Sequence, residues 1–106
     1  MERDYYKNIR LTDYEIETII NLAKKIFGED IKLWIFGSRT DLNEKGGDID
    51  IYLEIKNYNK ILKKKLDFLV ELDEKIGEQK VDLIIKPFNS NDYISQEAKK
   101  TGIRLI

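Results

Sequence analysis

Residues 36–51 read Phe-Gly-Ser-Arg-Thr-Asp-Leu-Asn-Glu-Lys-Gly-Gly-Asp-Ile-Asp-Ile and join an apolar stretch to a glycine-rich turn and a second strand. Asp48 and Asp50 alternate with isoleucines there, so both carboxylates point to one face of the strand. Two carboxylates about 5 Å apart repel by roughly 3 kcal/mol at an effective dielectric constant of about 20. The pair therefore favours a cation, and the turn with Gly37 and Ser38 favours phosphate.

The rest of the chain predicts one α+β domain over residues 1–106. Thr12 and Glu15 form a capping-box pattern before a helix that ends at Gly28, and a shorter helix starts at residues 90–92 and ends at Gly102. A middle helix is predicted over 60–76, with these residues inward: Leu62, Leu66, Leu69, Leu72 and Ile76. Strands are predicted over 31–36, 48–55 and 80–85, and the apolar tail 103–106 docks or pairs as an edge strand.

The connections predict a small mixed three-stranded sheet in the order 1-2-3, with helices packed on it. The middle helix is a crossover, so the second and third strands run parallel, whereas the short link 37–47 favours an antiparallel first pair. Asp82 opens the third strand and so falls at the same sheet edge as Asp48, Asp50 and the glycine turn. Taken alone, alternating acids are typical of a solvated face, and Lys80 can pair with Asp82; the convergence of three acids favours a site.

Composition limits the chemistry that the chain can perform. Hydrophobic residues make up 42% and charged residues 37%, which is typical of a globular domain. With 19 basic and 20 acidic residues, the chain has no strong field to attract nucleic acid, so no direct nucleic-acid binding is expected. It has no cysteine and no histidine, which excludes thiol nucleophiles, histidine bases and zinc–thiolate sites and leaves carboxylates to do any chemistry. No apolar run is long enough to span a membrane, and a cytoplasmic location is expected.

The pattern of a hydrophobic residue, Gly37 and Ser38, nine further residues, and then Asp48-Ile49-Asp50-Ile51 resembles the signature of the DNA polymerase beta-like nucleotidyltransferases. Asp82 matches the third acid of that superfamily. The length and the order of elements are similar to those of the minimal nucleotidyltransferase (MNT) antitoxins that pair with HEPN toxins. The resemblance covers nearly the whole chain.

The resemblance implies a metal-dependent transfer of AMP from ATP, with two Mg²⁺ ions at Asp48, Asp50 and Asp82. Gly37 and Ser38 would hold the phosphates, and Arg39 would lie near the pyrophosphate that leaves. Asp82 would help to deprotonate the attacking hydroxyl. The implied protein is an adenylyltransferase antitoxin that modifies (AMPylates) a hydroxyl, a tyrosine in this interpretation, of a partner HEPN toxin.

Two alternatives stay open at this point. Many MNT proteins read Gly-Ser-Arg-Ala-Arg-Gly, whereas this chain continues from Arg39 as Thr40-Asp41-Leu42, with Asp41 and Leu42 in place of a basic residue and a glycine. A second hypothesis is therefore a binding antitoxin that neutralises its partner by complex formation, with weak or lost catalysis. A third is a nucleotidyltransferase for small molecules, of the type that modifies aminoglycosides.

Overall fold

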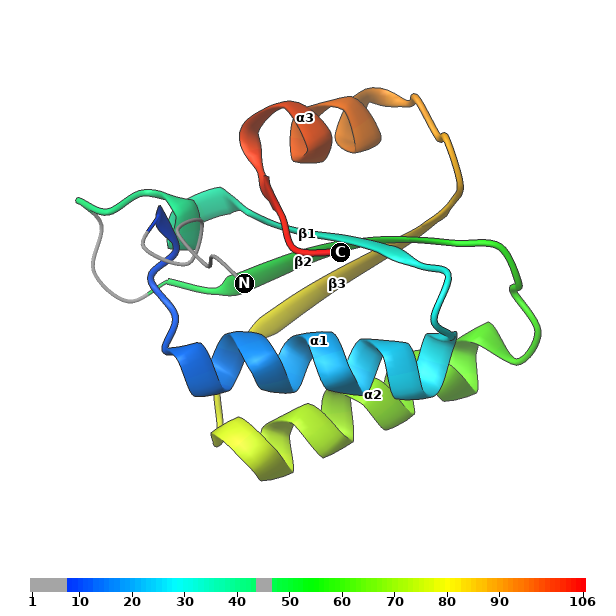
Figure 1. Ribbon diagram of the computed structural model, residues 1–106, viewed down its shortest axis with the longest axis horizontal. Coiled ribbons are helices and arrows are strands. Elements are labelled where there is room, and N and C mark those ends of the chain that lie inside the picture. The colour runs from blue at the N-terminus through cyan, green and yellow to red at the C-terminus, as the bar shows by residue number, and fades with distance from the viewer. Residues whose placement is uncertain (1–7, 44–46) are drawn as a thin grey trace.

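The computed structural model describes residues 8–43 and 47–106. Figure 1 shows α1 and α2 on one face of a sheet and α3 on the other, which confirms the predicted α+β class. The elements follow one another as α1 (Asp13–Phe27), β1 (Lys32–Phe36), the 3-10 helix η2 (Gly37–Thr40), β2 (Ile49–Ile55), α2 (Ile61–Ile76), β3 (Val81–Pro87), α3 (Tyr93–Thr101) and β4 (Ile103–Arg104).

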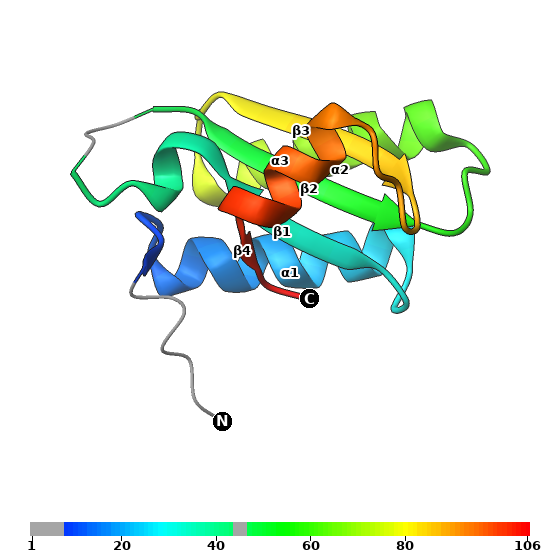
Figure 2. The same cartoon turned by 90° about the horizontal axis from the view of Figure 1, so that it is seen from above.

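The sheet has the predicted pairing and one more strand than predicted. Its order is β3-β2-β1-β4, with β1 antiparallel and β3 parallel to β2 (Figure 2). The expected three-stranded sheet gains β4 because the apolar tail returns along the free edge of β1, where the Leu105 N–H donates to the Leu33 carbonyl at 2.8 Å. β3 also continues through Pro87, which the sequence placed after the strand end; an edge strand tolerates proline.

The alternation predicted for the second strand separates two layers. Ile49, Ile51, Leu53 and Ile55 are at most 1% exposed and pack into the core against the first two helices. The opposite face carries Asp50 at one end and Tyr52 further along, where Tyr52 packs with Trp34 and Ala98 beneath α3. α3 thus covers one part of this face, and the acidic end stays more open.

The first helix forms as its capping box predicts. The Thr12 Oγ1 accepts the Glu15 N–H at 3.0 Å, and the Glu15 carboxylate accepts the Thr12 N–H at 2.9 Å. These two bonds satisfy N–H groups that have no partner within the helix. Residues of the predicted apolar stripe, Ile16, Ile19, Ala23 and Phe27, are buried.

The middle helix α2 is rotated from its predicted orientation. Phe68 and Leu72 are its buried residues, whereas Leu62 is 80% exposed and Leu66 is 61% exposed. The prediction that Leu62 and Leu66 face inward is therefore wrong, whereas Leu72 is buried and Leu69 and Ile76 pack against the core, as predicted. In the first half of the helix Phe68 is buried in place of these two leucines, which stay in solvent.

A buried ion pair fastens α3 to the sheet. The Glu54 carboxylate is 1% exposed and accepts hydrogen bonds from the Lys99 ammonium at 2.6 Å, the Tyr52 hydroxyl at 2.7 Å and the Asn89 N–H at 3.1 Å. Burial pushes the pKa of Glu54 upward, but these hydrogen bonds outweigh it and bring the pKa below its ordinary value of 4.5. Glu54 is therefore an anion in the folded protein at neutral pH.

The lowered pKa of Asp92, the N-cap residue of α3, leads us to expect a lower free energy of unfolding in acid. Hydrogen bonds from Lys86 and Ser95 lower its pKa from 3.8 to about 2 in the folded protein. A lowered folded-state pKa stabilises the fold above the unfolded-state pKa, and that contribution is lost as pH falls from about 4 to about 2. Asp92→Asn keeps a capping oxygen that does not titrate, so its free energy of unfolding, measured in urea at several pH values, should fall less steeply over this range. Parallel curves for the two proteins would contradict the assignment.

None of the helices in residues 8–43 and 47–106 is long and apolar enough to cross a lipid bilayer.

Candidate active site

Asp50 and Asp82 are brought side by side by the pairing of two parallel strands. They are register partners on β2 and β3, and Phe36, the last residue of β1, is the partner of Asp50 on the other side. Asp48 lies directly before β2, and its carboxylate is 3.6 Å from the Lys80 ammonium. The three acids predicted from sequence therefore meet at one end of the sheet, next to η2 (Figure 2).

The crowding of these carboxylates affects the protonation of Asp50. Burial raises its pKa above the ordinary value of 3.8, and the charge of Asp82, a hydrogen bond with Asp82 and the charge of Asp48 raise it further. Lys80 offsets this effect only in part. Since the Lys80–Asp48 pair is largely exposed, it stabilises the cluster weakly. An arrangement that holds like charges together in this way favours a bound cation.

Two glycines with positive φ let the turn after β1 approach these acids. Gly37 has a φ of +78°, and a Cβ at this position would collide with the Oδ2 of Asp50. Gly47 has a φ of +92°, and a Cβ there would collide with the Ser38 hydroxyl, which donates to the Asp48 carbonyl at 3.4 Å. Ser38 and the backbone of Gly37 are thereby held directly beside the carboxylates, as the sequence predicts.

Gly37→Ala is expected to reduce both stability and nucleotidyl transfer. The positive φ alone costs an L-residue about 1–2 kcal/mol. The collision with Asp50 displaces a carboxylate of the candidate site, and if that carboxylate takes part in transfer, about a 10²-fold loss of rate is expected. Gly77→Ala is the matched control, because Gly77 has a φ of +88° and a Cβ there would meet no atom within 4 Å. Thermal unfolding and a transfer assay should show that Gly77→Ala loses stability alone. Equal activity losses in the two variants would contradict this account.

Arg10 and Arg39 hold the same turn by exchanging hydrogen bonds with its backbone. The Arg10 guanidinium donates to the carbonyls of Ser38 and Asp41 at 2.9 and 2.8 Å. The backbone N–H of Arg10 donates to the Arg39 carbonyl at 2.7 Å. The Arg39 guanidinium donates to the Arg10 carbonyl at 2.7 Å and to the Gly47 carbonyl at 3.2 Å. A third bond joins it to the Gln79 side chain at 3.0 Å.

These contacts add to the predicted site a residue that sequence reasoning missed. Arg10 lies in a polar segment without periodicity, and its partners are 28 and 31 residues away along the chain, so no local pattern points to it. For Arg39 the resemblance to nucleotidyltransferases implies a position near the leaving pyrophosphate. In this structure its guanidinium fixes the loop between β1 and β2, and a role at the pyrophosphate stays a prediction.

The carboxylates fit a hard divalent cation that shares its coordination with a nucleotide. Among the described residues, no group of three or more histidine, cysteine or acidic side chains is gathered tightly enough to hold a metal by itself. Mg²⁺ commonly takes one or two carboxylates and completes its shell with phosphate oxygens and water. Asp50 and Asp82, with Asp48 nearby, supply that kind of oxygen donor set, so the predicted Mg²⁺ ions fit this edge when a triphosphate is bound.

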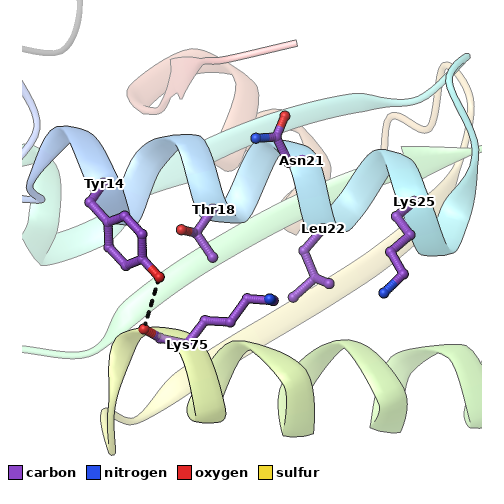
Figure 3. A pocket seen from close by; sticks show the side chains of 6 residues that line it. All are labelled: Tyr14, Thr18, Asn21, Leu22, Lys25 and Lys75. Carbon is purple, nitrogen blue, oxygen red and sulfur yellow. Dashed lines mark hydrogen bonds between the residues drawn. The ribbon is translucent and has the colours of Figure 1, made fainter.

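The hollows of the protein differ in the residues that line them. One of about 500 Å³ has both Asp50 and Asp82 in its wall. The other, of about 310 Å³, lies in the helix layer between α1 and α2 and is lined by Tyr14, Thr18, Asn21, Leu22, Lys25 and Lys75 (Figure 3). None of these six residues is acidic, and the Tyr14 hydroxyl donates to the Lys75 carbonyl at 3.3 Å across the gap. The carboxylate hollow is therefore the candidate active site.

The comparison with protein families agrees with this geometry. The family model described as a nucleotidyltransferase domain matches residues 16–105. This match contains both the glycine-serine turn and all three acids. A comparison with curated proteins finds no significant match. The match spans most of the chain, from within α1 to the residue after β4, so the chain belongs to the nucleotidyltransferase domain family.

Proposed function

We propose that this nucleotidyltransferase domain transfers AMP from ATP to a hydroxyl group of a partner protein. The observation that carries the proposal is the register pairing of Asp50 with Asp82, directly beside the turn at Gly37. Carboxylates that can hold a divalent cation, beside a turn that offers backbone N–H groups and a hydroxyl, suit a reaction on a nucleoside triphosphate. The membership of the chain in the nucleotidyltransferase family supports the same reaction class.

Each residue of the site has a role in the proposed reaction. The backbone at Gly37 and the hydroxyl of Ser38 hold the phosphates, and Asp48, Asp50 and Asp82 hold Mg²⁺ ions, which supply charge neutralisation when bound. Asp82, exposed at the outer strand, takes the proton from the acceptor hydroxyl. The oxygen then forms a bond to the α-phosphorus, the bond from this phosphorus to the bridging oxygen breaks, and pyrophosphate leaves with that electron pair.

The proposed partner is a HEPN-family toxin, with this chain as its antitoxin and a tyrosine as the acceptor. The resemblance of the Gly37-Ser38 and Asp48-Ile49-Asp50 pattern to the MNT antitoxins supports this assignment. The carboxylate hollow opens at the edge of the sheet, so a protein-borne hydroxyl has a route to Asp82.

The test incubates the purified chain with Mg²⁺, ATP labelled at the α-phosphate, and a candidate HEPN-family protein, chosen by inspecting the neighbouring reading frame for a small all-helical protein. Label should appear on the partner and depend on Mg²⁺, and mass spectrometry should find an added AMP on a tyrosine. Label that persists after both Asp48→Asn and Asp50→Asn would exclude this site.

A second candidate function is neutralisation by binding alone. The Arg39 guanidinium is used to hold the loop through the Arg10 and Gly47 carbonyls and the Gln79 side chain. Asp41 and Leu42 follow it where many MNT proteins carry a basic residue and a glycine, and both features favour weak triphosphate binding. An Asp48→Asn/Asp50→Asn double variant separates the two functions. If it binds its partner but fails to protect cells, catalysis is required; if it protects fully, binding is sufficient.

A further inference from the structure

An apolar row lies exposed along α2. Leu62, Leu66 and Val70 are spaced at four residues, so they lie on one side of the helix, and they are 80%, 61% and 50% exposed. Within the described residues these three side chains are among the few large apolar groups left in solvent. A row of this kind indicates a surface for binding another molecule.

This row adjoins the candidate active site. Leu69, one turn from Leu66, lines the hollow of about 500 Å³ together with Lys65. The same hollow contains Asp50 and Asp82, and a smaller hollow of about 150 Å³ shares Leu69 with it. Apolar surface on α2 is therefore continuous, around the edge of the sheet, with the carboxylates.

The strand between these two features is the outer strand of the sheet. β3 pairs with β2 on one side, and on its other side no strand of the described chain lies against it (Figure 2). The backbone groups on such an edge can pair with an extended segment of another protein. Asp82 points to the same face as Asp50, and Leu83 points to the helix side, into the core.

We propose that β3 and the apolar row of α2 form the docking surface for the acceptor, which binds as an extended segment added to the edge of β3. This inference rests on the proposed protein acceptor and specifies how that acceptor is held. A residue opposite Asp82 on an added strand would lie about 5 Å away, on the same face. Its hydroxyl would then continue the line that runs from Asp50 to Asp82.

The same register determines what the neighbouring residues of the acceptor must be. Side chains alternate along a strand, so the residues on each side of the acceptor point toward α2. There they meet Leu66 and Leu69, which favours apolar side chains. Further along, Lys65 favours an acidic residue. The fitting sequence is acidic at its ends, with a hydroxyl residue between two apolar ones.

A synthetic peptide tests the docking surface without depending on catalysis. The probe is acetyl-Glu-Thr-Val-Tyr-Val-Thr-Glu-amide, added to ¹⁵N-labelled protein in the absence of ATP, with backbone amide shifts followed by NMR. Shifts should change over residues 81–85 and 62–70, with a Kd of roughly 0.1–1 mM. A peptide with N-methylated valines, which cannot form the strand pairing, should bind at least about tenfold more weakly.

Leu66→Lys is the matching protein variant, and Tyr93→Lys is its control. Both replace an exposed apolar residue, and Tyr93 is 77% exposed on α3, on the other face of the sheet. Leu66→Lys should weaken peptide binding about tenfold, and Tyr93→Lys should leave it unchanged. Circular dichroism verifies that both variants fold.

Three results of the peptide titrations would overturn the proposal. They are the absence of shift changes at about 5 mM peptide, well above the expected Kd, shift changes confined to other elements, and equal binding by Leu66→Lys and the wild type. Concentration-dependent shifts of the same amides without peptide would also overturn it, because they would assign this face to a second copy of the chain. Adding Mg²⁺ and ATP then tests the function separately: a peptide that binds without gaining AMP would contradict peptide-level transfer and leave the docking surface intact.

Discussion

Asp50→Asn is expected to lower nucleotidyl transfer by about 10²–10³-fold or more and, at the same time, to stabilise the metal-free protein. The loss follows from the position of Asp50, which is the middle carboxylate in the line from Asp48 to Asp82 and touches the turn at Gly37. An amide keeps the size of the side chain but removes the negative charge that is proposed to hold a cation. Transfer rates at saturating Mg²⁺ measure this effect.

The expected stabilisation arises because the negative charge of Asp50 is unfavourable in the metal-free folded protein. The pKa of Asp50 is raised in the folded protein by burial and by its acidic neighbours, so its ionisation opposes folding as pH rises above 3.8. Asn removes that cost, and at pH 7 without Mg²⁺ the unfolding midpoint should rise, by roughly 4–8 °C for each kcal/mol relieved. Asp73→Asn, an exposed acid on α2, is the control and should change neither quantity appreciably. An Asp50→Asn protein that is inactive because it is unfolded would contradict both halves of the prediction.

The sequence predicts the sheet order and the meeting of the acids because both depend on local patterns. Strict alternation from Asp48 to Ile55 identifies the middle strand, and the crossover helix sets the direction of the third. The parallel pairing then places Asp82, at the start of the third strand, beside Asp50. The orientation of α2 is less predictable, since the pair Leu62 and Leu66 and the pair Phe68 and Leu72 both have helical spacing. Only packing against the sheet decides which stripe is buried.

The turn at the site shows a different limit of sequence reasoning. Glycines at 37 and 47 mark it clearly, and the structure explains both through the atoms that a side chain would strike. Its stabilisation by Arg10 depends on carbonyl groups about thirty residues away, which no spacing rule reveals. In the same way, the buried pair of Glu54 and Lys99 is invisible in a sequence where charged residues make up 37% of the chain.

Lys99→Met is expected to cost the fold about 3–5 kcal/mol, the largest stability loss predicted here for a single polar side chain. The Glu54 carboxylate is 1% exposed, and Lys99 is its cationic partner at 2.6 Å. Removing that partner leaves a buried charge with hydrogen bonds from Tyr52 and the Asn89 N–H alone. Urea unfolding at pH 7 measures the loss, and Lys100→Met, an exposed neighbour on α3, is the matched control.

The pH dependence of the same variant tests the mechanism. In the wild type the pKa of Glu54 lies below 4.5, so its contribution to stability is present above 4.5 and is lost as pH falls through the lowered folded-state pKa. Without Lys99, burial dominates and the folded-state pKa of Glu54 rises above 4.5. Protonation of Glu54 then removes the cost of burying its charge. The variant should therefore lose less stability than the wild type as pH is lowered toward 4.5. The Glu54→Gln/Lys99→Met double variant, which buries no charge, should recover part of the stability at pH 7. If the double variant is no more stable than Lys99→Met, the loss arises from the other contacts of the Lys99 ammonium, with the Trp34 ring and the Ser90 carbonyl, and the buried charge is not its cause.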